Sequence, residues 1–306
     1  MTLLATSHHP AMPGTSPATA VMDTNRPALA RLVNYWLGGK DHLAADRTLG
    51  DQITRVHPGI PHGYRAARQA AARTVAALAT DGIRQFVDLG TGLPTPDRTD
   101  THTIAQHTAP TSTTLYVDHD PLVLAHCRAL HLSDPAGSVV VVDADLTDAA
   151  HLTATVATRV DLSAPVAVLA TSVAHHLDDP HLHDLVTQLT RRLPAGSRIV
   201  VTTHTTRRGD DRLRQVQHLL TQAGIPYHRR TPAQIAVLLR GCGLTLSPPA
   251  IPPSGWAPPA PDEPADDDTH EVLTDVQIGR IDTTHRQQRT NPPHRDRPQG
   301  AVDAPR

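Results

Sequence analysis

A glycine-rich turn is the part of the sequence best suited to bind a ligand. The apolar run at residues 86–89 (FVDL) leads directly into Gly90, Thr91 and Gly92. Because glycine has no Cβ, such a backbone can pass close to a ligand and present its N–H groups as donors. A turn of this kind, at the carboxyl end of the first strand of a doubly wound sheet, binds nucleotide-like cofactors.

The residues after the turn indicate which cofactor fits. The dinucleotide fingerprint G-x-G-x-x-G requires a third glycine where this chain has Thr95, and Pro94 and Pro96 delay the next helix to about Thr99. No helix N-terminus therefore lies directly behind the turn to hold a diphosphate. A cofactor without phosphate fits better, and S-adenosylmethionine, an adenosine joined through a sulfonium to an amino acid, is one. A turn that only connects strand and helix is the alternative.

Acidic residues end the next two predicted strands. Asp118 closes residues 114–118 (TLYVD), where a carboxylate can accept hydrogen bonds from both ribose hydroxyls. Asp120 precedes Pro121 and is better explained as a helix N-cap. Asp143 ends residues 138–143 (SVVVVD) and Asp145 follows two residues later, where an acid can bind the adenine amino group, with a helix cap as the alternative.

His175 is the candidate catalytic residue. It follows the predicted strand at residues 165–171, where the reactive end of a cofactor would lie, and a histidine there can act as a general base. The chain has 21 histidines, so a bystander role is the alternative for any one of them. The spacing of the histidines at positions 175, 176, 181 and 183 matches no zinc signature, and no metal site is predicted.

Composition narrows the class of protein. The 306 residues carry a formal charge of −2, with one Phe, two Trp and four Tyr, which does not indicate a binder of nucleic acid or of anionic membranes. Cys127 and Cys242 are far apart without a C-x-x-C motif, consistent with a reducing cytoplasm. No apolar run reaches about 18 residues, and the N-terminus lacks a basic region, so neither a membrane span nor a signal peptide is predicted.

Helical and strand patterns alternate along the chain. Helices are predicted near residues 26–37, 43–56, 64–80, 101–107, 121–132, 180–193, 210–223 and 231–240. Strands are predicted at residues 86–89, 114–118, 138–143, 165–171 and 198–203, with a terminal hairpin from residues 244–247 and 276–281. This alternation predicts an α/β fold with a doubly wound, mostly parallel sheet covered on both faces.

The domain organisation follows from composition. Residues 1–22 and 285–306 contain too few large apolar residues to form a core and are predicted to be disordered tails. Residues 23–284 are predicted to form a single domain, with a helical cap at residues 23–81 and a Rossmann-like core at residues 82–284.

The first helix of the cap is predicted to reach the cofactor. Gly38 and Gly39 end this amphipathic helix and allow a sharp turn, which would bring Lys40 and Asp41 to the mouth of the pocket near the glycine turn. Lys40 would then meet the cofactor carboxylate, with a solvated lysine as the alternative. In the other arrangement the helix packs on the outer face of the sheet, and Gly38 and Gly39 only stop it.

Several motifs together resemble a bacterial family of S-adenosylmethionine-dependent methyltransferases whose substrates are undefined. The matching stretches are residues 34–41 (NYWLGGKD), 45–47 (ADR), 82–94 (GIRQFVDLGTGLP), 116–121 (YVDHDP), 143–146 (DADL), 173–175 (VAH) and 178–179 (DD). The resemblance covers about residues 24–257.

The resemblance implies a seven-stranded methyltransferase sheet that binds S-adenosyl-L-methionine. The cofactor-binding residues predicted by motif and resemblance are Gly38, Gly39, Lys40, Asp88, Gly90, Thr91, Gly92, Asp118, His119, Asp145 and Leu146. Two departures stand out. The family tends to carry Asn-Arg and a nearby Phe where this chain has Ala67, Arg68 and Ala70, and an aromatic residue where it has His176.

These observations predict a cytoplasmic methyltransferase that transfers the sulfonium methyl group to a small-molecule acceptor, without nucleic-acid or membrane partners. One alternative is a non-catalytic module that binds the same cofactor, which the departures at Ala67 and His176 keep open. The other is an NAD-dependent dehydrogenase, disfavoured because Asp118 lies 28 residues after Gly90 instead of about 20. The acceptor and the oligomeric state do not follow from the sequence.

Overall fold

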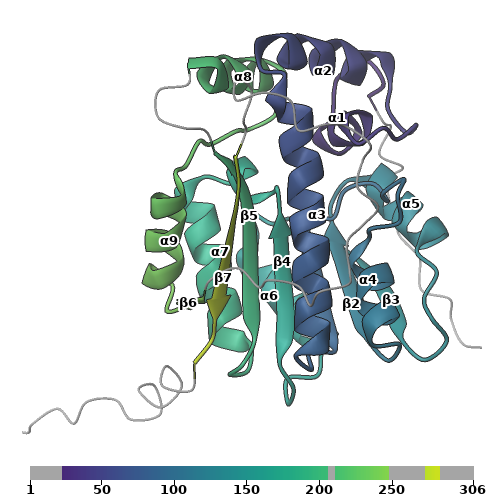
Figure 1. Cartoon of the computed structure of the whole chain (residues 1–306), viewed down its shortest axis with the longest axis vertical. Helices are drawn as coiled ribbons and strands as arrows, with labels where there is room; N and C mark the ends of the chain where they lie inside the picture. The colour runs from purple at the N-terminus through teal and green to yellow at the C-terminus, as the bar shows by residue number, and fades with distance from the viewer. Residues whose placement is uncertain (1–22, 206–210, 248–272, 283–306) are drawn as a thin grey trace, which may run out of the picture.

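The computed structural model describes residues 23–205, 211–247 and 273–282, and a sheet forms its centre (Figure 1). The strands are β1 (Gln85–Leu89), β2 (Thr113–Asp118), β3 (Ser138–Asp143), β4 (Val166–Thr171), β5 (Arg198–Thr205), β6 (Thr245–Ser247) and β7 (Leu273–Arg280). Their order is β3-β2-β1-β4-β5-β7-β6, with β7 antiparallel to both of its neighbours. The predicted fold class, a doubly wound, mostly parallel sheet with a terminal hairpin, is confirmed. The predicted tails, residues 1–22 and 285–306, lie outside the described residues. The predicted domain boundaries therefore stay predictions.

The helices follow the predicted pattern with two differences. They are α1 (Leu29–Trp36), α2 (Ala44–Val56), α3 (Gly59–Thr80), α4 (Thr101–Thr108), α5 (Pro121–Leu130), α6 (Ala149–Ala157), α7 (Asp179–Arg192), α8 (Asp211–Gln222) and α9 (Pro232–Gly241). Helix α3 begins five residues earlier than predicted, because Pro61 lies in its first turn, where proline is tolerated. Helix α6, with only nine residues (AAHLTATVA), is not among the predicted helices.

Two apolar layers cover the sheet. On one face, side chains of α6, α7 and α9 pack on the central strands in a core that includes Leu152, Leu185 and Ile235. On the other face, the C-terminal half of α3 packs with α4 on residues such as Phe86 and Leu169. The parallel strands are thus buried on both sides, as their nearly continuous apolar sequences require.

A third core joins helices from opposite ends of the chain into a helical cap. Helices α1 and α2 and the first turns of α3 pack against α8, together with Ile225 and Tyr227. Figure 1 shows α1, α2 and α8 gathered at one end of the sheet. The cap predicted for residues 23–81 therefore includes a helix that the sequence assigns to the second half of the chain.

A buried ion pair holds the start of the cap. Arg31 of α1 donates from Nε to Oδ2 of Asp46 in α2 at 2.8 Å, and the two side chains are 4% and 0% exposed. Asp46 also accepts backbone hydrogen bonds from Ala28 and Leu43. One carboxylate therefore joins three chain segments at the N-terminal edge of the cap.

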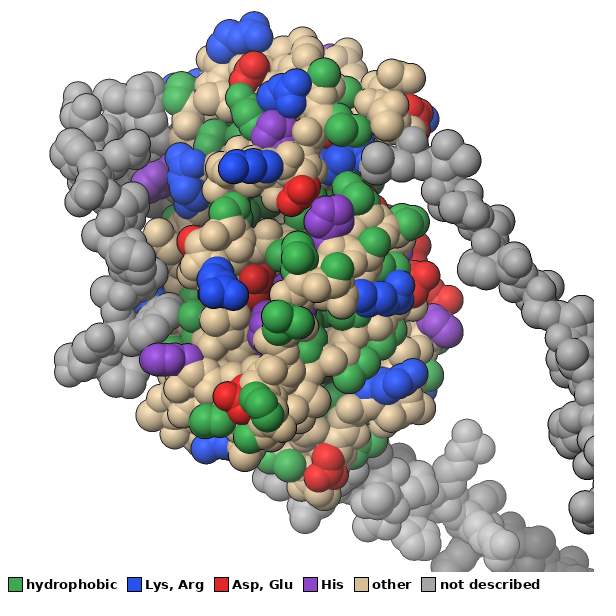
Figure 2. Space-filling view, turned by 90° about the vertical axis from the view of Figure 1, so that its right-hand side faces the viewer, with side chains coloured by type: hydrophobic (Ala, Val, Ile, Leu, Met, Phe, Trp, Pro, Cys, Tyr) green, Lys and Arg blue, Asp and Glu red, His purple; other side chains and the backbone are tan. Residues whose placement is uncertain are grey.

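The surface carries charges of both signs. On the face shown in Figure 2, basic and acidic side chains are interspersed with apolar ones. Among the described residues, no helix combines the length and apolarity needed to cross a bilayer.

Replacing Asp46 by Ala is expected to lower the free energy of unfolding by roughly 3–5 kcal/mol, because it leaves the Arg31 guanidinium buried without its counter-charge. Chemical denaturation of the full chain measures this. The matched control is Asp51→Ala in the same helix, where an exposed carboxylate accepts only from the Tyr35 hydroxyl. That change should cost less than about 1 kcal/mol. Equal costs for the two variants would contradict the role given to Asp46.

Candidate functional site

A cavity of about 460 Å³ lies at the carboxyl ends of β1 to β4, beneath the helical cap. Its volume is within the range typical of sites for small molecules and cofactors. The sheet side is lined by Gly90, Gly92, Asp118, His119, Asp120, Asp145, Leu146, Thr147, Thr171, Ser172, Val173, His176 and Leu177. The cap side is lined by Pro27, Ala28, Leu29, Ala30, Val33, Tyr64, Arg68, Gly224, Ile225 and Pro226.

The glycine turn forms the floor of this cavity, and its glycines are required by geometry. Gly90 and Gly92 have φ angles of 60° and 68°, in the left-handed region that favours glycine. A Cβ on Gly90 would lie 2.6 Å from Cγ2 of Val173, so the turn has no room for a side chain there. Arg68 of α3 crosses the turn and donates from Nη2 to the carbonyl oxygen of Thr91 at 2.6 Å.

Asp118 ties the ends of β1 and β2 together. Its Oδ2 accepts from the N–H of Gly92 at 3.0 Å, and its Oδ1 accepts from the N–H groups of His119 and Asp120 at 2.8 and 3.0 Å. Each carboxylate oxygen has two lone pairs, so Oδ2 keeps one acceptor position for a ligand. The side chain thus shapes the turn and lines the cavity at the same time.

The third acidic position lies at the end of β3. Asp145 is exposed and lines the cavity beside Leu146. The N–H of Thr147 donates to its Oδ1 at 2.8 Å, and this backbone hydrogen bond lowers the pKa of the carboxyl. Asp143 is exposed and does not line the cavity. The acidic residues after β2 and β3 therefore share one half of the site.

Two predicted cofactor-binding residues lie beneath the turn instead of in the cavity. The Asp88 carboxylate is buried and accepts from the Thr101 hydroxyl at 2.7 Å, and burial raises its pKa despite the nearby Arg68. Thr91 is buried, and its carbonyl oxygen is bound by Arg68. Both residues support the turn from below.

Gly38, Gly39 and Lys40 are not among the residues that line the cavity. Lys40 is exposed, and the neighbouring Asp41 lies 3.6 Å from Nε2 of His126 in α5. The N-terminal half of α1, not the turn after its C-terminus, covers the cavity. The first helix thus reaches the cavity through residues 27–33, whereas the segment predicted to line it, residues 38–40, does not.

The cavity is lined by His176 and not by His175, the candidate catalytic residue. Both belong to the short 3-10 helix η1 (Ala174–His176) that follows β4. His175 is buried at 3% exposure and does not line the cavity, whereas His176 does. Successive residues of a 3-10 helix are about 120° apart, so only one of the two can face the cavity.

A cluster of aromatic and imidazole rings surrounds η1. Tyr64 stacks on Trp36 with ring centroids 5.1 Å apart, and it meets His204 of β5 edge-on at 4.3 Å. Tyr227 packs on His175 at 4.9 Å. Burial lowers the pKa of His176 to about 4 and that of His204 to about 3, and it lowers the pKa of His175 well below the usual value. All three histidines are therefore neutral at pH 7.

Ser172 adds a strained backbone at the end of β4. It has a φ of 55°, which is uncommon for a residue other than glycine. Its N–H donates to Oγ1 of Thr202 at 2.9 Å, and its hydroxyl lies 3.3 Å from Nε2 of His204. Such strain often accompanies functional sites, and this residue lines the cavity.

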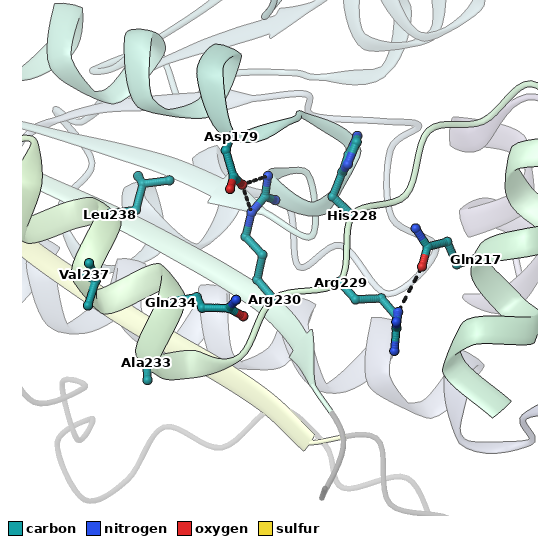
Figure 3. Close-up of a pocket in the computed structure, with 9 residues that line it drawn as sticks. All are labelled: Asp179, Gln217, His228, Arg229, Arg230, Ala233, Gln234, Val237 and Leu238. Atoms are coloured by element: carbon teal, nitrogen blue, oxygen red, sulfur yellow. Dashed lines mark hydrogen bonds and ion pairs between the residues drawn. The ribbon is translucent and has the colours of Figure 1, made fainter. Parts of the chain in front are cut away.

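A larger surface groove of about 810 Å³ runs between α7, α8 and α9 (Figure 3). Its cationic side chains are already paired. Arg230 contacts Asp179 with Nε at 2.7 Å, and Arg229 donates to Oε1 of Gln217 at 2.9 Å. Arg230 also donates to the carbonyl oxygens of Ala174 and Leu177 at 2.8 and 2.7 Å. Arg230, which lines this groove, therefore holds the backbone of η1, on which the cavity residue His176 lies.

The sequence missed several residues that line or support the cavity. Arg68, Tyr64 and His176 occur in or near the family motifs but carried no predicted role. The roof residues Gly224, Ile225 and Pro226 have no pattern that indicates a site. Of the departures from the family pattern, Ala67 and Ala70 are buried in α3 away from the cavity lining, and only His176 lies in it.

Comparisons with known proteins are consistent with this geometry. A family model described as S-adenosyl methyltransferase matches residues 15–282. A DUF574 family protein from Streptomyces avermitilis is 33% identical, covering 84% of this chain and 98% of its own, with a TM-score of 0.74. A candidate methyltransferase from Thermobifida fusca is 30% identical, covering 85% and 97%, with a TM-score of 0.70. No curated protein matches the chain.

The neutral histidines predict a pH dependence of stability. Their pKa values are lowered by folding from about 6.5, so the unfolded chain binds protons first as the pH falls. Stability is fully present above about pH 6.5 and decreases toward pH 4, by roughly 2 kcal/mol at pH 5 for each such histidine. Urea denaturation at pH 7.5, 6 and 5 measures the slope.

Replacing His204 by Asn is expected to make this slope shallower, because one buried imidazole no longer titrates. The control is His183→Asn on the exposed face of α7, which should leave the slope unchanged. A free energy of unfolding that is constant from pH 7.5 to pH 5 would contradict the neutral, buried state of the cluster.

Proposed function

The chain belongs to the S-adenosyl methyltransferase family, and from this premise we propose how it binds the methyl donor and which acceptors it takes. It is an S-adenosylmethionine-dependent methyltransferase with a Rossmann-like sheet. The donor supplies an activated methyl group on a sulfonium, so the protein has mainly to align an acceptor with it and exclude water. Nothing in the family match favours a dehydrogenase or a non-catalytic module.

The cavity below the cap is the proposed donor site. The observation that carries this proposal is the meeting of the Gly90–Gly92 turn, Asp118 and Asp145 along one edge of the sheet. Asp118 would accept hydrogen bonds from the ribose hydroxyls. Asp145, Leu146 and His119 would surround the adenine. The two glycines would let the amino acid part lie on the backbone of the turn.

The residues present fit such a ligand. The Gly90 position has no room for a Cβ, Oδ2 of Asp118 keeps an acceptor position, and Arg68 holds a guanidinium beside the turn. Arg68 is the proposed partner of the donor carboxylate, in the place that the sequence assigned to Lys40. Asp88 and Thr91 would act indirectly by holding the turn, and Gly38 and Gly39 are not part of the proposed site.

The acceptor is proposed to be a small molecule. The cavity is closed above by residues of α1 and by the segment 224–226. The chain has a formal charge of −2, and the basic side chains on the face shown in Figure 2 are interspersed with acidic ones, which does not indicate a binder of nucleic acid. The buried, unpaired Cys127 and Cys242 fit a cytoplasmic location. We further propose that residues 23–284 form a single domain, since α8 packs in the same core as α1 and α2.

Replacing Asp118 by Asn is expected to weaken binding of S-adenosylhomocysteine at least about tenfold, because a charge-assisted hydrogen bond to the ribose is lost. Isothermal titration calorimetry measures this, and NAD should show no binding. The control is Asp148→Asn, because Asp148 is an exposed N-cap carboxylate that accepts from the N–H of His151 and does not line the cavity. Tight NAD binding, or an unchanged Kd in the variant, would overturn the ribose assignment.

Replacing Arg68 by Gln is expected to weaken S-adenosylhomocysteine about tenfold or more while leaving 5′-methylthioadenosine within about twofold, since only the former carries a carboxylate. Arg65→Gln is the matched control, because Arg65 lies in the same helix and donates to the Trp36 carbonyl oxygen. Equal losses for the two ligands would show that Arg68 acts only through the shape of the turn.

A further inference from the structure

The two nitrogens of the His176 ring have different partners, which fixes its tautomer. Nδ1 lies 2.6 Å from the carbonyl oxygen of Pro226, which can only accept. Nδ1 therefore carries the hydrogen, and Nε2 carries a lone pair. His176 lines the cavity, so this imidazole is a neutral hydrogen-bond acceptor held at the ligand site.

Tyr64 completes a directed chain of hydrogen bonds. Its hydroxyl lies 3.5 Å from Nε2 of His176 and 3.5 Å from Nε2 of His175. Because Nε2 of His176 accepts, Tyr64 donates to it when no ligand is bound and accepts from Nε2–H of His175. Both contacts are at the long limit of a hydrogen bond, so a ligand hydroxyl that donates to Nε2 of His176 takes the place of Tyr64. Nδ1 of His175 is then an unprotonated acceptor, which agrees with its having no hydrogen-bond partner among the described residues. Burial raises the pKa of Tyr64 well above 10, so the hydroxyl keeps its proton.

The backbone that carries His176 is clamped by the segment that precedes α9. The N–H of His228 donates to the carbonyl oxygen of His175 at 2.7 Å. Arg230 holds the carbonyl oxygens of Ala174 and Leu177, and Asp179 holds the guanidinium in turn (Figure 3). Four consecutive residues of η1 and its end are therefore fixed from residues 226–230, so the ring has a defined direction.

The two ends of the cavity differ in charge. Among the described lining residues, the carboxylates Asp118, Asp120 and Asp145 all follow β2 or β3. The lining after β4 is neutral, with Thr171 and Ser172 as polar groups and Val173 and Leu177 as apolar ones. The cap adds mainly apolar side chains to the lining, including Leu29, Val33 and Ile225. An uncharged, mainly apolar acceptor suits this half.

We propose that His176 takes the proton of an acidic hydroxyl, such as a phenol, on a small apolar acceptor bound at the β4 end of the cavity. The proposal rests on the proposed function. The acceptor oxygen forms a bond to the methyl carbon, the electron pair of the carbon–sulfur bond stays on sulfur, and the hydroxyl proton passes to Nε2 and then to solvent. The products are the methyl ether, S-adenosylhomocysteine and one proton.

The surroundings of His176 agree with this class of acceptor. The titratable groups that face it are Tyr64, His175, His204, Tyr227 and His228, none of which is a carboxylate. Its low pKa makes it a weak base, which suffices for a hydroxyl that becomes more acidic as its oxygen bonds to carbon. The single positive charge passes from sulfur to the imidazole at the β4 end, and it leaves this end when the proton moves to solvent. A protonated amine would find no counter-charge there.

The first test compares two probes that differ only in the hydroxyl. Binding of 4-cyanophenol and of its methyl ether to the full chain saturated with S-adenosylhomocysteine is measured by calorimetry at pH 6.5. The phenol should bind about tenfold more tightly than the ether, because it alone donates to Nε2. His176→Asn, which keeps a donor for Pro226 but lacks Nε2, should abolish the difference, and His183→Asn should retain it. A preference that is absent in the wild type, or that survives in His176→Asn, overturns the proposal.

Turnover provides the second test. With methyl-labelled S-adenosylmethionine and 4-cyanophenol, His176→Asn should reduce turnover by about a hundredfold or more at saturating donor. Transfer only to primary amines, no transfer by the wild type, or equal turnover in the variant overturns it. Binding of S-adenosylhomocysteine should stay within about twofold in His176→Asn. If the wild type does not bind this ligand, the proposed function itself fails, and the two failures are thereby distinguished.

A third measurement needs no variant to fold. Long-range ¹H–¹⁵N spectra of the histidine-labelled wild type should show His176 protonated at Nδ1 and unprotonated at Nε2 at pH 7. The opposite tautomer would remove the lone pair from the cavity and overturn the proposal.

Discussion

Helix α3 connects the cap rigidly to the sheet, and the site depends on this continuity. Its 22 residues span roughly 33 Å, so one rod reaches from the sheet core to the cap core. The C-terminal half packs alanines and Leu78 on the sheet, and the N-terminal half places Ile60 and Tyr64 among the side chains of α1, α2 and α8. Arg68 lies between these halves and binds the glycine turn. Because one helix belongs to both cores, α3 couples the cap above the cavity to the glycine turn that forms its floor.

The fold could be predicted from the sequence because its signals are local. Strand and helix periodicities, the glycine turn and the acids at strand ends each depend on neighbouring residues, and the structure confirms the sheet that they predict. The sequence pattern could not predict which end of a helix, or which of two adjacent side chains, faces the cavity. Periodicity identifies the apolar face of α1, but not which of its ends lies over the cavity, and residues 27–33 line it while residues 38–40 do not. The adjacent His175 and His176 have the same local sequence, and only the 3-10 geometry of η1 decides which one faces the cavity. Residues 224–230 could not be assigned to the site, because their contacts with η1 join positions about 50 apart in the chain.

The buried histidine cluster makes the folded state less stable at low pH. Neutral imidazoles buried beside Tyr64 lower stability as the pH falls, whereas apolar side chains of similar size would not. Their advantage is that they form hydrogen bonds without carrying a charge. Functional sites commonly retain such locally unfavourable groups. Arg230 is a charged group that also serves η1 without entering the cavity. Its guanidinium binds the carbonyl oxygens of Ala174 and Leu177 and pairs with Asp179.

The division of labour between sheet and cap follows from these contacts. In the proposed site, the sheet supplies the groups that suit the methyl donor, namely the glycine turn and the carboxylates at the ends of β2 and β3, and their positions are set by strand order. The remaining lining comes from α1, the N-terminal half of α3 and residues 224–226, which lie outside the sheet. Because the donor is common to the reaction and the acceptor is not, we propose that selectivity for the acceptor resides in these cap residues. The size and polarity of Leu29, Val33 and Ile225 would then set which acceptors enter, while η1 would set the chemistry they undergo.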